Sequence, residues 1–456
     1  MSREDADKDL KVMLGDPRKA VIAMTVPLLF SFLVVQINSF ADSSWCSMLG
    51  VDSASATATI APIYWIVSGI GTGLGVGAST AIARHLGARD KESADGMVSQ
   101  TMAIGIAVGI VFTPILWLLV GPSITFMGAD EIRDECMDYI APIVLCTIAF
   151  VLNGAVSGLL RSEGAAKKST VMLLVAAVLN IVLDPVLMFW LDMGIAGAGW
   201  ATSISTIVST AVGLWWYLNG SMYLTMSLRG FSWNIPESKE ILSVAVPRTG
   251  EFASESAMCM IQRIFIFACA GSSGAALYNI PWKYVVLAEV VSLAIGSAVI
   301  PIASAALGQG DLEKADVAYR FGMRLTVLSM TAIAVVLFVF AYEAMIPLTL
   351  SESMAEIRPE FAWVLRIYAL CIPFMGVLDM ASSILQSMQK AQVSFLCVFA
   401  RDVLTVVLLA LTYTISFEAV IYSVLVATVI GMVLMVAMMR VESSKLSRNF
   451  AEGHAA

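Results

Sequence analysis

The sequence predicts an all-α membrane protein with twelve transmembrane helices in two six-helix lobes. Hydrophobic residues make up 59% of the 456-residue chain and charged residues only 14%, with a mean hydropathy of +0.84. A soluble protein carries about 25% charged residues. In addition, LGARDKESAD at 86–95 returns as LGQGDLEKAD at 307–316. A chain that repeats itself inside a membrane has usually built two bundles that face each other across a path, which makes transport the first hypothesis.

Twelve segments are long and apolar enough to span a membrane, since a spanning helix needs about 20 mostly apolar residues. They divide six and six, which predicts an N-lobe at 1–226, a cytoplasmic linker at 227–239, and a C-lobe with a cytoplasmic tail at 240–456. Because six is even, both lobes enter the membrane from the same side, and their pseudo-two-fold axis runs along the membrane normal. The segments are 20–46, 57–84, 97–120, 136–160, 168–191, 197–219, 240–269, 275–306, 320–346, 361–387, 393–415 and 418–440.

The repeated motif predicts how the helices on either side of it end and begin. Gly87 and Gly308 each follow a long apolar run, and a glycine commonly ends a helix. Asp90 and Asp311 then stand where an N-cap carboxylate begins the next helix. An architectural role for the motif is therefore favoured over a direct part in gating.

Lysine and arginine residues gather in one set of loops and in both terminal segments. The opposite loops hold only Arg133 and Arg358, among many acids. The positive-inside rule then predicts cytoplasmic N- and C-termini in a multi-pass protein of the cytoplasmic (inner) membrane. The charged N-terminal segment does not read as a cleaved signal peptide, so the first apolar segment is expected to be a permanent helix.

Several function classes find no support in the sequence. The net charge is −8, without a basic stripe, so no nucleic-acid partner is expected. The seven cysteines are scattered and the two histidines lie in a loop and in the tail, which argues against a disulfide or metal framework. GxSxG, HExxH and Walker-A motifs are absent, so we expect no enzyme, no cofactor and no ATP-driven pump. The expected partners are small organic substrates and membrane lipids, bound by a monomer.

Two acids lie at similar depth in the predicted N-lobe, where an unpaired carboxylate costs several kcal/mol. Asp42 falls in the outer half of the first helix, and Asp184 falls between mid-depth and the outside in the fifth helix, one turn after Asn180. Ala198 and Thr202 of the sixth helix reach the same level. Such oxygen ligands suit Na⁺, or a proton shared between two acids. The alternative is that both acids merely hydrogen-bond neighbouring helices.

The seventh predicted helix carries charges at helical spacing. Arg248 and Glu251 are three residues apart near its cytoplasmic end, which predicts an ion pair. Glu255 lies nearer mid-depth and either binds a proton or substrate or pairs with a basic residue such as Arg263 or one on another helix. Arg401, near the start of the eleventh helix, is expected to extend toward the cytoplasmic interface.

Four sequence elements in the first half resemble the multidrug and toxic compound extrusion (MATE) family, with its prokaryotic DinF-like branch closest. They are QINSFAD at 36–42, SGLLRSEG at 157–164, the Asn180-x-x-x-Asp184-Pro185 element and GIAGAGWAT at 194–202. The resemblance implies two six-helix lobes around a V-shaped cavity. It also implies export of organic, often cationic, compounds driven by entry of Na⁺ or H⁺.

The resemblance further implies site residues. The implied cation (Na⁺ or H⁺) site comprises Asp42, Asn180, Asp184, Ala198 and Thr202, with a possible Na⁺ held by Asp42, Asn180, Asp184 and Thr202. Glu255 occupies the position of an acid in NorM-like members of the family, and Asp379 resembles another such acid in placement only. The further substrate or coupling candidates are Gln36, Asn38, Tyr139, Asn153, Glu251, Glu255 and Asp379.

The function expected from these observations is that of a secondary active antiporter. It would export organic, amphipathic, often cationic compounds in exchange for H⁺ or Na⁺. The alternative is a flippase of the same superfamily that moves lipid-linked precursors. Arg248, Arg263 and Lys283 could bind the pyrophosphate of such a substrate, but the acids among them argue against it.

Overall fold

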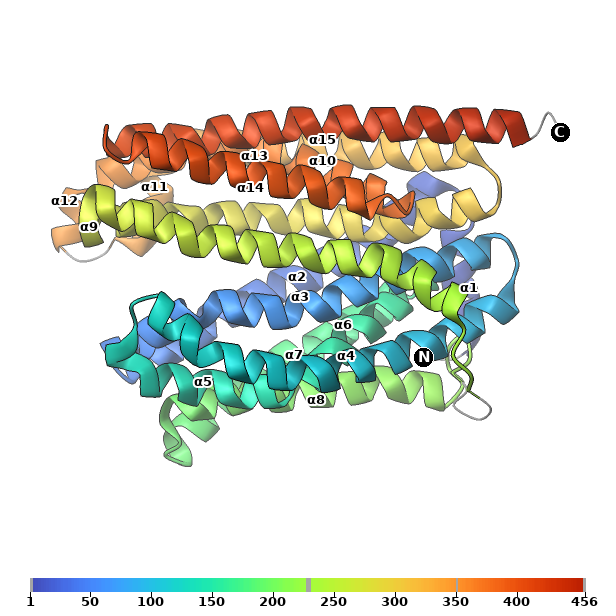
Figure 1. Ribbon diagram of the computed structural model, residues 1–456, viewed down its shortest axis with the longest axis horizontal. Coiled ribbons are helices and arrows are strands. Elements are labelled where there is room, and N and C mark those ends of the chain that lie inside the picture. The colour runs from blue at the N-terminus through green and yellow to red at the C-terminus, as the bar shows by residue number, and fades with distance from the viewer. Residues whose placement is uncertain (1–2, 227–230, 350–351, 454–456) are drawn as a thin grey trace.

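The computed structural model describes residues 3–226, 231–349 and 352–453, and within these segments it contains helices and turns but no strand. Figure 1 shows the helices in two layers, α1 to α8 in one and α9 to α15 in the other, which we call the first half and the second half. Both chain termini lie at the same end of the bundle, the termini end, and the opposite end is the far end.

The helices of the first half are α1 (Arg3–Met13), α2 (Pro17–Met48), α3 (Val51–Gly87), α4 (Lys91–Phe126), α5 (Arg133–Leu145), α6 (Thr147–Ser162), α7 (Ala166–Pro185) and α8 (Gly194–Leu218). Those of the second half are α9 (Ile235–Gly308), α10 (Leu312–Val339), α11 (Ala341–Met345), α12 (Glu352–Glu356), α13 (Arg358–Ser387), α14 (Ala391–Thr412) and α15 (Phe417–Gly453).

The predicted all-α membrane fold is confirmed. Eleven helices of the described segments are long and apolar enough to cross a membrane, and a twelfth span is formed if α5 and α6, bent by 56°, count as one. Pro142 lies one turn before this break, where proline removes a helical hydrogen bond. Likewise, α9 holds two spans, because Gly271 adopts a φ of 59° that a side chain would disfavour.

The N-caps predicted from the repeated motif are present. Asp90 accepts a hydrogen bond from the backbone N–H of Ser93 at 3.1 Å, and Asp311 accepts one from Lys314 at 2.9 Å. The predicted linker differs from the structure at its end, since α9 already begins at Ile235. Its N-cap is Asn234, which accepts from the backbone N–H of Glu237. Residues 227–230 of that linker lie outside the described segments.

The two halves meet along α3, whose glycines form two contact faces. A Cβ at Gly69 would come within 2.7 Å of Phe252 Cβ, and Cβ atoms at Gly73 and Gly77 would overlap α9 in the same way. Gly75, on the other face, lies against the backbone of α6. Small residues let helices approach closely inside a membrane. Consequently, α3 packs against both its own half and the partner half.

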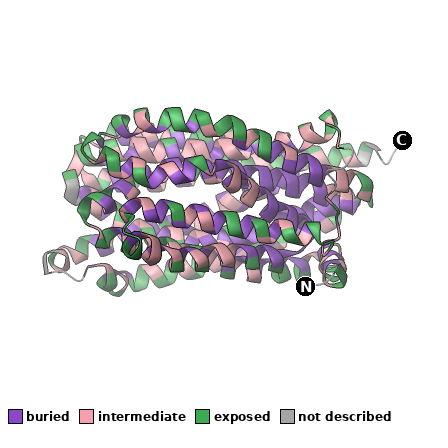
Figure 2. Ribbon diagram, turned by 90° about the horizontal axis from the view of Figure 1, so that it is seen from below, coloured by how far each residue is buried: buried purple, intermediate pink, exposed green. Residues whose placement is uncertain are grey.

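These contacts are closest at the termini end. Nearly every residue of α3 from Gly69 to Leu86 is buried, whereas only Cys46 is buried between residues 32 and 52 at the far end of α2 and the turn that follows it. Figure 2 shows buried residues gathering toward the end that carries the two termini. The far part of α2, which carries Asp42, therefore has few close neighbours.

Candidate functional site

Helices α2, α7 and α8 bring most of the predicted cation-site residues together. Asn180 donates from Nδ2 to Asp184 Oδ1 at 3.0 Å and, more weakly, to Thr202 Oγ1 at 3.5 Å. Asn38 donates to Asn180 Oδ1 at 2.7 Å, which links α2 to α7. The one-turn spacing of Asn180 and Asp184 places both on one face of α7, as helical periodicity requires.

Asp42 joins this group from α2. The Tyr139 hydroxyl of α5 donates to Asp42 Oδ2 at 3.3 Å, and Asp42 also interacts electrostatically with Asp184. On the α8 side, Thr202 donates to the carbonyl oxygen of Ala198 at 3.0 Å. The structure therefore brings together Asp42, Asn180, Asp184, Thr202 and Ala198, the five residues of the predicted site.

Two oxygen atoms of the group have no hydrogen-bond partner. Asp184 is fully buried, yet its Oδ2 has none, and neither has Oδ1 of Asn38. A buried charged or polar atom without a partner is costly, particularly at membrane depth. Both atoms are acceptors, so a hard cation would satisfy either of them, and a proton would neutralise the carboxylate of Asp184. The described residues contain no group of three or more His, Cys, Asp or Glu side chains that could hold a metal ion. A cation here would therefore depend on amide, hydroxyl and carbonyl oxygens beside the two acids.

Two candidates of the first half lie outside this group. Gln36 precedes Asn38 by two positions on α2, so its side chain leaves a different side of the helix. Asn153 of α6 instead donates to Ser209 at 3.0 Å and to Thr210 at 3.1 Å on α8, which makes it a link between two helices of the first half.

Cys46 is a neighbour of the site that sequence reasoning missed. Its thiol lies 3.9 Å from Asp42 Oδ1, and it is the buried residue of the far part of α2. The spacing of four residues between Asp42 and Cys46 was the available signal, because it puts both on one helix face. A scattered cysteine in an apolar segment is otherwise typical of packing.

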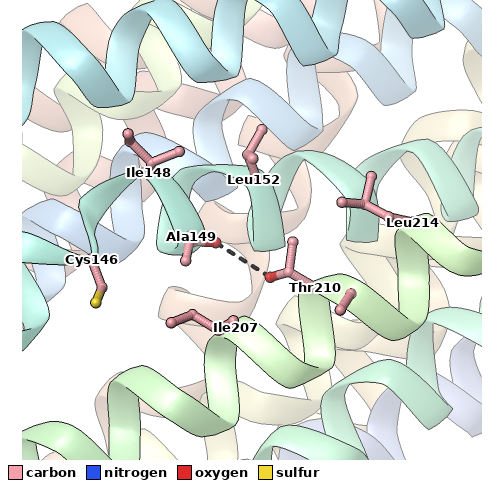
Figure 3. Close-up of a pocket in the computed structure, with 8 residues that line it drawn as sticks. Cys146, Ile148, Ala149, Leu152, Ile207, Thr210 and Leu214 are labelled. Carbon is pink, nitrogen blue, oxygen red and sulfur yellow. Dashed lines mark hydrogen bonds between the residues drawn. The ribbon is translucent and has the colours of Figure 1, made fainter.

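A surface recess between α6 and α8 is separate from these acids. It encloses 340 Å³ and is lined by Cys146, Ile148, Ala149, Leu152, Ile207, Thr210, Ala211 and Leu214. Figure 3 shows its mostly apolar side chains and the hydrogen bond from Thr210 to the carbonyl of Ala149. No candidate residue lines it, and an apolar lining of this kind does not select a charged compound.

In the second half, the predicted pair of Arg248 and Glu251 is confirmed. Glu251 is only 1% exposed and also accepts from Ser394 Oγ at 2.6 Å and from Gln386 Nε2 at 3.4 Å. Both carboxylate oxygens thus have partners from three helices. Such a fully satisfied buried acid has the environment of a structural residue.

Glu255 has a different environment. Its side chain is 44% exposed, and its partner is Arg401 of α14 at 3.4 Å, while Arg263 instead donates to the carbonyl of Ala58 on α3. The expectation that Arg401 reaches the interface is wrong. Its side chain is only 12% exposed, and it is held by Asp402 at 2.7 Å as well as by Glu255. Two carboxylates retain it inside the bundle.

Asp379 lies near this cluster. Ser292 of α9 donates to Asp379 Oδ2 at 2.7 Å, and Asp379 interacts electrostatically with both Arg248 and Arg401. Glu289 in turn interacts with Asp379 and Glu255. The second half therefore contains one mixed cluster of acids and two arginines, whereas the first half contains an acid pair to which no described arginine or lysine forms an ion pair.

This fold and these sites define a polytopic membrane protein of two helical halves with ionisable groups at membrane depth. Residues 27–186 and 247–412 match the family MatE, one stretch in each half, and the chain belongs to that family. The family expected from the sequence elements of the first half is thereby confirmed.

Similar proteins include the multidrug export protein MepA of Staphylococcus aureus (strain COL), 24% identical over 287 residues. MepA of Staphylococcus saprophyticus is 28% identical over 298 residues. Both matches cover 62% of this chain and 63% of the relative, so they span less than two thirds of those proteins.

Solved structures match nearly the whole chain. A MATE protein in complex with MaL6 has a TM-score of 0.91 and 26% identity, covering 97% of this chain and 99% of its own. An outward-facing multidrug resistance MATE transporter of the MOP superfamily has a TM-score of 0.91 and 25% identity, covering 96% and 98%. The likeness includes both halves and their arrangement.

Proposed function

We propose that this protein is a secondary active antiporter that exports organic, amphipathic, often cationic compounds in exchange for H⁺ or Na⁺. The observation that carries the proposal is the acid pair of Asp42 and Asp184, in which the buried Asp184 Oδ2 has no partner. The names of the MepA relatives and of the MATE structures support export of drug-like compounds.

The proposal places the termini end in the cytoplasm and the far end outside. The lysine and arginine residues of the loops support this orientation. The halves pack together at the termini end, and the far part of α2 is sparsely covered, which supports an outward-facing arrangement. Asp42 and Asp184 would then take up a cation from outside.

In the proposed cycle, a cation neutralises the acid pair and lets α2 pack more closely against α7. Asn38 and Asn180 already connect these helices, so a change at Asp184 reaches α2 through two hydrogen bonds in series, Asp184 to Asn180 and Asn180 to Asn38. Coupling requires only that the cation and the substrate favour different conformations of the two halves. A substrate bound in the conformation that it favours is then released outside when the cation binds and favours the other conformation.

Glu255 is the proposed contact for cationic substrates in the second half. It is the exposed member of its cluster, whereas Glu251 is enclosed by its partners. We expect Asp379 to add negative charge behind it. The flippase alternative relies on Arg248, Arg263 and Lys283. We favour the antiporter, since Arg248 is paired with Glu251 and Arg263 donates to the carbonyl of Ala58.

The proposal is tested with purified protein in liposomes under an imposed pH or Na⁺ gradient, with a panel of cationic dyes as substrates. Asp184→Asn should reduce gradient-driven export about 100-fold, which lies within the range of coupling between two ligands of one protein. Glu131→Gln, an exposed acid of the far end, is the matched control and should export as the native protein does. Gradient-driven export at the native rate by Asp184→Asn would overturn the role of the pair.

A further inference from the structure

The repeated motif of the sequence brings the two halves into contact with each other at the termini end. Gly87 of α3 lies against the carbonyl of Ala305 on α9, and Gly308 of α9 lies against the carbonyl of Arg84 on α3. A Cβ at Gly87 would also come to 2.8 Å from the Ala305 carbonyl carbon, so each glycine is required by the backbone of the other half. The two copies of the motif thus cross at one point.

Polar side chains around this crossing join the halves. Arg84 Nη1 donates to Gln389 Oε1 at 2.9 Å, and His85 Nε2 lies 3.2 Å from Glu240 Oε2. Gln389 also donates from Nε2 to Glu240 Oε1 at 2.6 Å. Since Arg84 and His85 are adjacent on α3, the four residues close a ring. Two of them belong to the first half and two to the second.

The backbone of Gln389 shows that this ring has a conformational cost. Gln389 has a φ of 59°, in the left-handed region that favours glycine. It lies in the turn between α13 and α14, and the corresponding turn of the first half, between α6 and α7, has Gly164 at a φ of 76°. Arg89 has a similar φ where the second copy of the motif has Gly310, so the φ alone assigns no role and the assignment rests on the bonds of the side chain. Here the glutamine side chain bonds both Arg84 and Glu240.

Two further contacts lie at the same end. Lys314 of α10 donates to the carbonyl of Leu14, and Ser238 of α9 donates to Gln100 of α4 at 3.2 Å. Asp90 holds the second ring nitrogen of His85 at 3.3 Å, which fixes the imidazole toward Glu240. The ring is therefore part of a layer of contacts that joins the two halves at this end.

We propose that Arg84, His85, Glu240 and Gln389 form a latch that holds the two halves together at the termini end, and that the latch must open before that end can admit substrate. The second clause rests on the proposed transport function, whereas the first concerns the conformation of the chain alone. The latch also assigns a role to the repeated glycines, because their crossing brings the four side chains within bonding distance.

Hydrogen exchange of the full chain in lipid nanodiscs, read by mass spectrometry, tests the latch. Gln389→Gly and Glu240→Ala should each raise exchange about tenfold in peptides covering 84–92 and 303–311. The first removes the bonds of Gln389 to Arg84 and Glu240, and the second removes the bonds of Glu240 to His85 and Gln389. Arg89→Gly is the matched control. Arg89 is an exposed residue at the same end with a φ of 62°, and no hydrogen bond from it to the second half is found in the described segments.

The comparison separates the latch from general effects of backbone strain. Both glycine variants relieve a left-handed residue, so exchange in Gln389→Gly equal to that in Arg89→Gly would overturn the latch. The double variant Glu240→Ala with Gln389→Gly should raise exchange by less than the product of the two single effects, because both single variants already lose the bond between Gln389 and Glu240. If the native protein showed no gradient-driven export, the proposed transport function would be overturned. The exchange result would still decide whether the four residues hold the two halves together.

Discussion

Asp42 and Asp184 interact with each other but obtain their hydrogen bonds from different partners. Asp42 receives a tyrosine hydroxyl and lies near a thiol, whereas Asp184 receives one amide N–H and keeps one oxygen free. Because the two acids differ in this way, we expect them to contribute unequally. Asp184 Oδ2 is the acceptor that a cation would bind, and Asp42 is the neighbouring acid that interacts electrostatically with Asp184.

Tyr139→Phe tests how far the hydroxyl supports the pair. The variant loses one hydrogen bond to a carboxylate, which is worth about 1.5–3 kcal/mol. We expect the proton or Na⁺ concentration that gives half-maximal export to change by roughly tenfold, while the maximal rate falls less. Export assayed across a pH series and an Na⁺ series measures both quantities. An unchanged half-maximal concentration for both ions would contradict a role for Tyr139.

Glu163 provides a pH-dependent prediction outside the membrane-spanning helices. This fully buried acid accepts from the Tyr217 hydroxyl at 2.7 Å and from the backbone N–H groups of Tyr223 at 2.9 Å and Leu224 at 3.0 Å. Burial raises the pKa of Glu163 from 4.5 to about 7. Between these values the folded chain keeps a proton that the unfolded chain releases, so stability falls as the pH rises from about 4.5 to about 7.

Glu163→Gln cannot ionise and keeps one acceptor oxygen, as the protonated acid does, for part of these donors. As the pH rises from about 4.5 to about 7, the unfolding free energy of the native protein should therefore fall relative to that of the variant. The expected fall is on the order of 3 kcal/mol. Thermal unfolding in detergent, recorded at several pH values from 4.5 to 7.5, measures the shift. Parallel curves for the two proteins would show that Glu163 does not titrate in this range.

At the scale of the element, α3 joins the halves because glycine recurs on two of its faces. Gly73 and Gly77 lie against α9, and Gly71 and Gly75 lie against α6. The neighbouring atoms are mostly backbone atoms, which cannot move aside as a flexible side chain can. Overpacking a close contact of this kind typically costs about 1–3 kcal/mol.

Gly75→Ala should lower the melting temperature and the yield of folded protein, since its Cβ would come within 3.0 Å of the Gly154 carbonyl carbon. Gly121→Ala on α4 is the matched control. Its Cβ would meet only the flexible end of Arg133, at 2.8 Å, and alanine favours a helix. Size-exclusion fluorescence after heating compares the two. Equal melting temperatures would show that α3 can shift to admit a methyl group.

Much at the scale of the element could be predicted from sequence. The spans, the N-caps Asp90 and Asp311, and the pair of Arg248 and Glu251 all depend on residues close together along one helix. Periodicity and local hydrogen bonding fix such features. The partner of Glu255 could not be predicted in the same way, because Arg401 reaches it only through the packing of α14 against α9.

At the scale of the whole molecule, the asymmetry of the halves is chemical rather than architectural. Both halves are helical bundles, and the copies of one motif meet at the crossing of Gly87 and Gly308. Yet the acid pair of the first half forms no ion pair with any arginine or lysine of the described segments, whereas the second half holds acids balanced by Arg248 and Arg401. We expect the first half to bind the coupling ion and the second to contact the substrate.

This division predicts separable effects on transport. Glu255→Gln should raise the KM for dications about tenfold and leave the dependence on the driving ion unchanged, since one charge contact to the substrate is lost. Asp184→Asn should abolish the response to the gradient while dye binding persists. Binding and gradient-driven export are measured on the same preparation of liposomes. A shift of the ion dependence by Glu255→Gln would instead place the coupling ion in the second half.

The sequence by itself determined the membrane class, the helices, the family and the five residues of the acid site, because these follow from hydropathy, helical spacing and specific local elements. Only the tertiary structure decided which oxygen of Asp184 lacks a partner, that Arg401 is held by Glu255 and Asp402, and that Gln389 bridges Arg84 and Glu240. The reason is physical: these contacts depend on how helices rotate and approach across the two halves. That information is distributed over many packing contacts and is not contained in any local stretch of the chain.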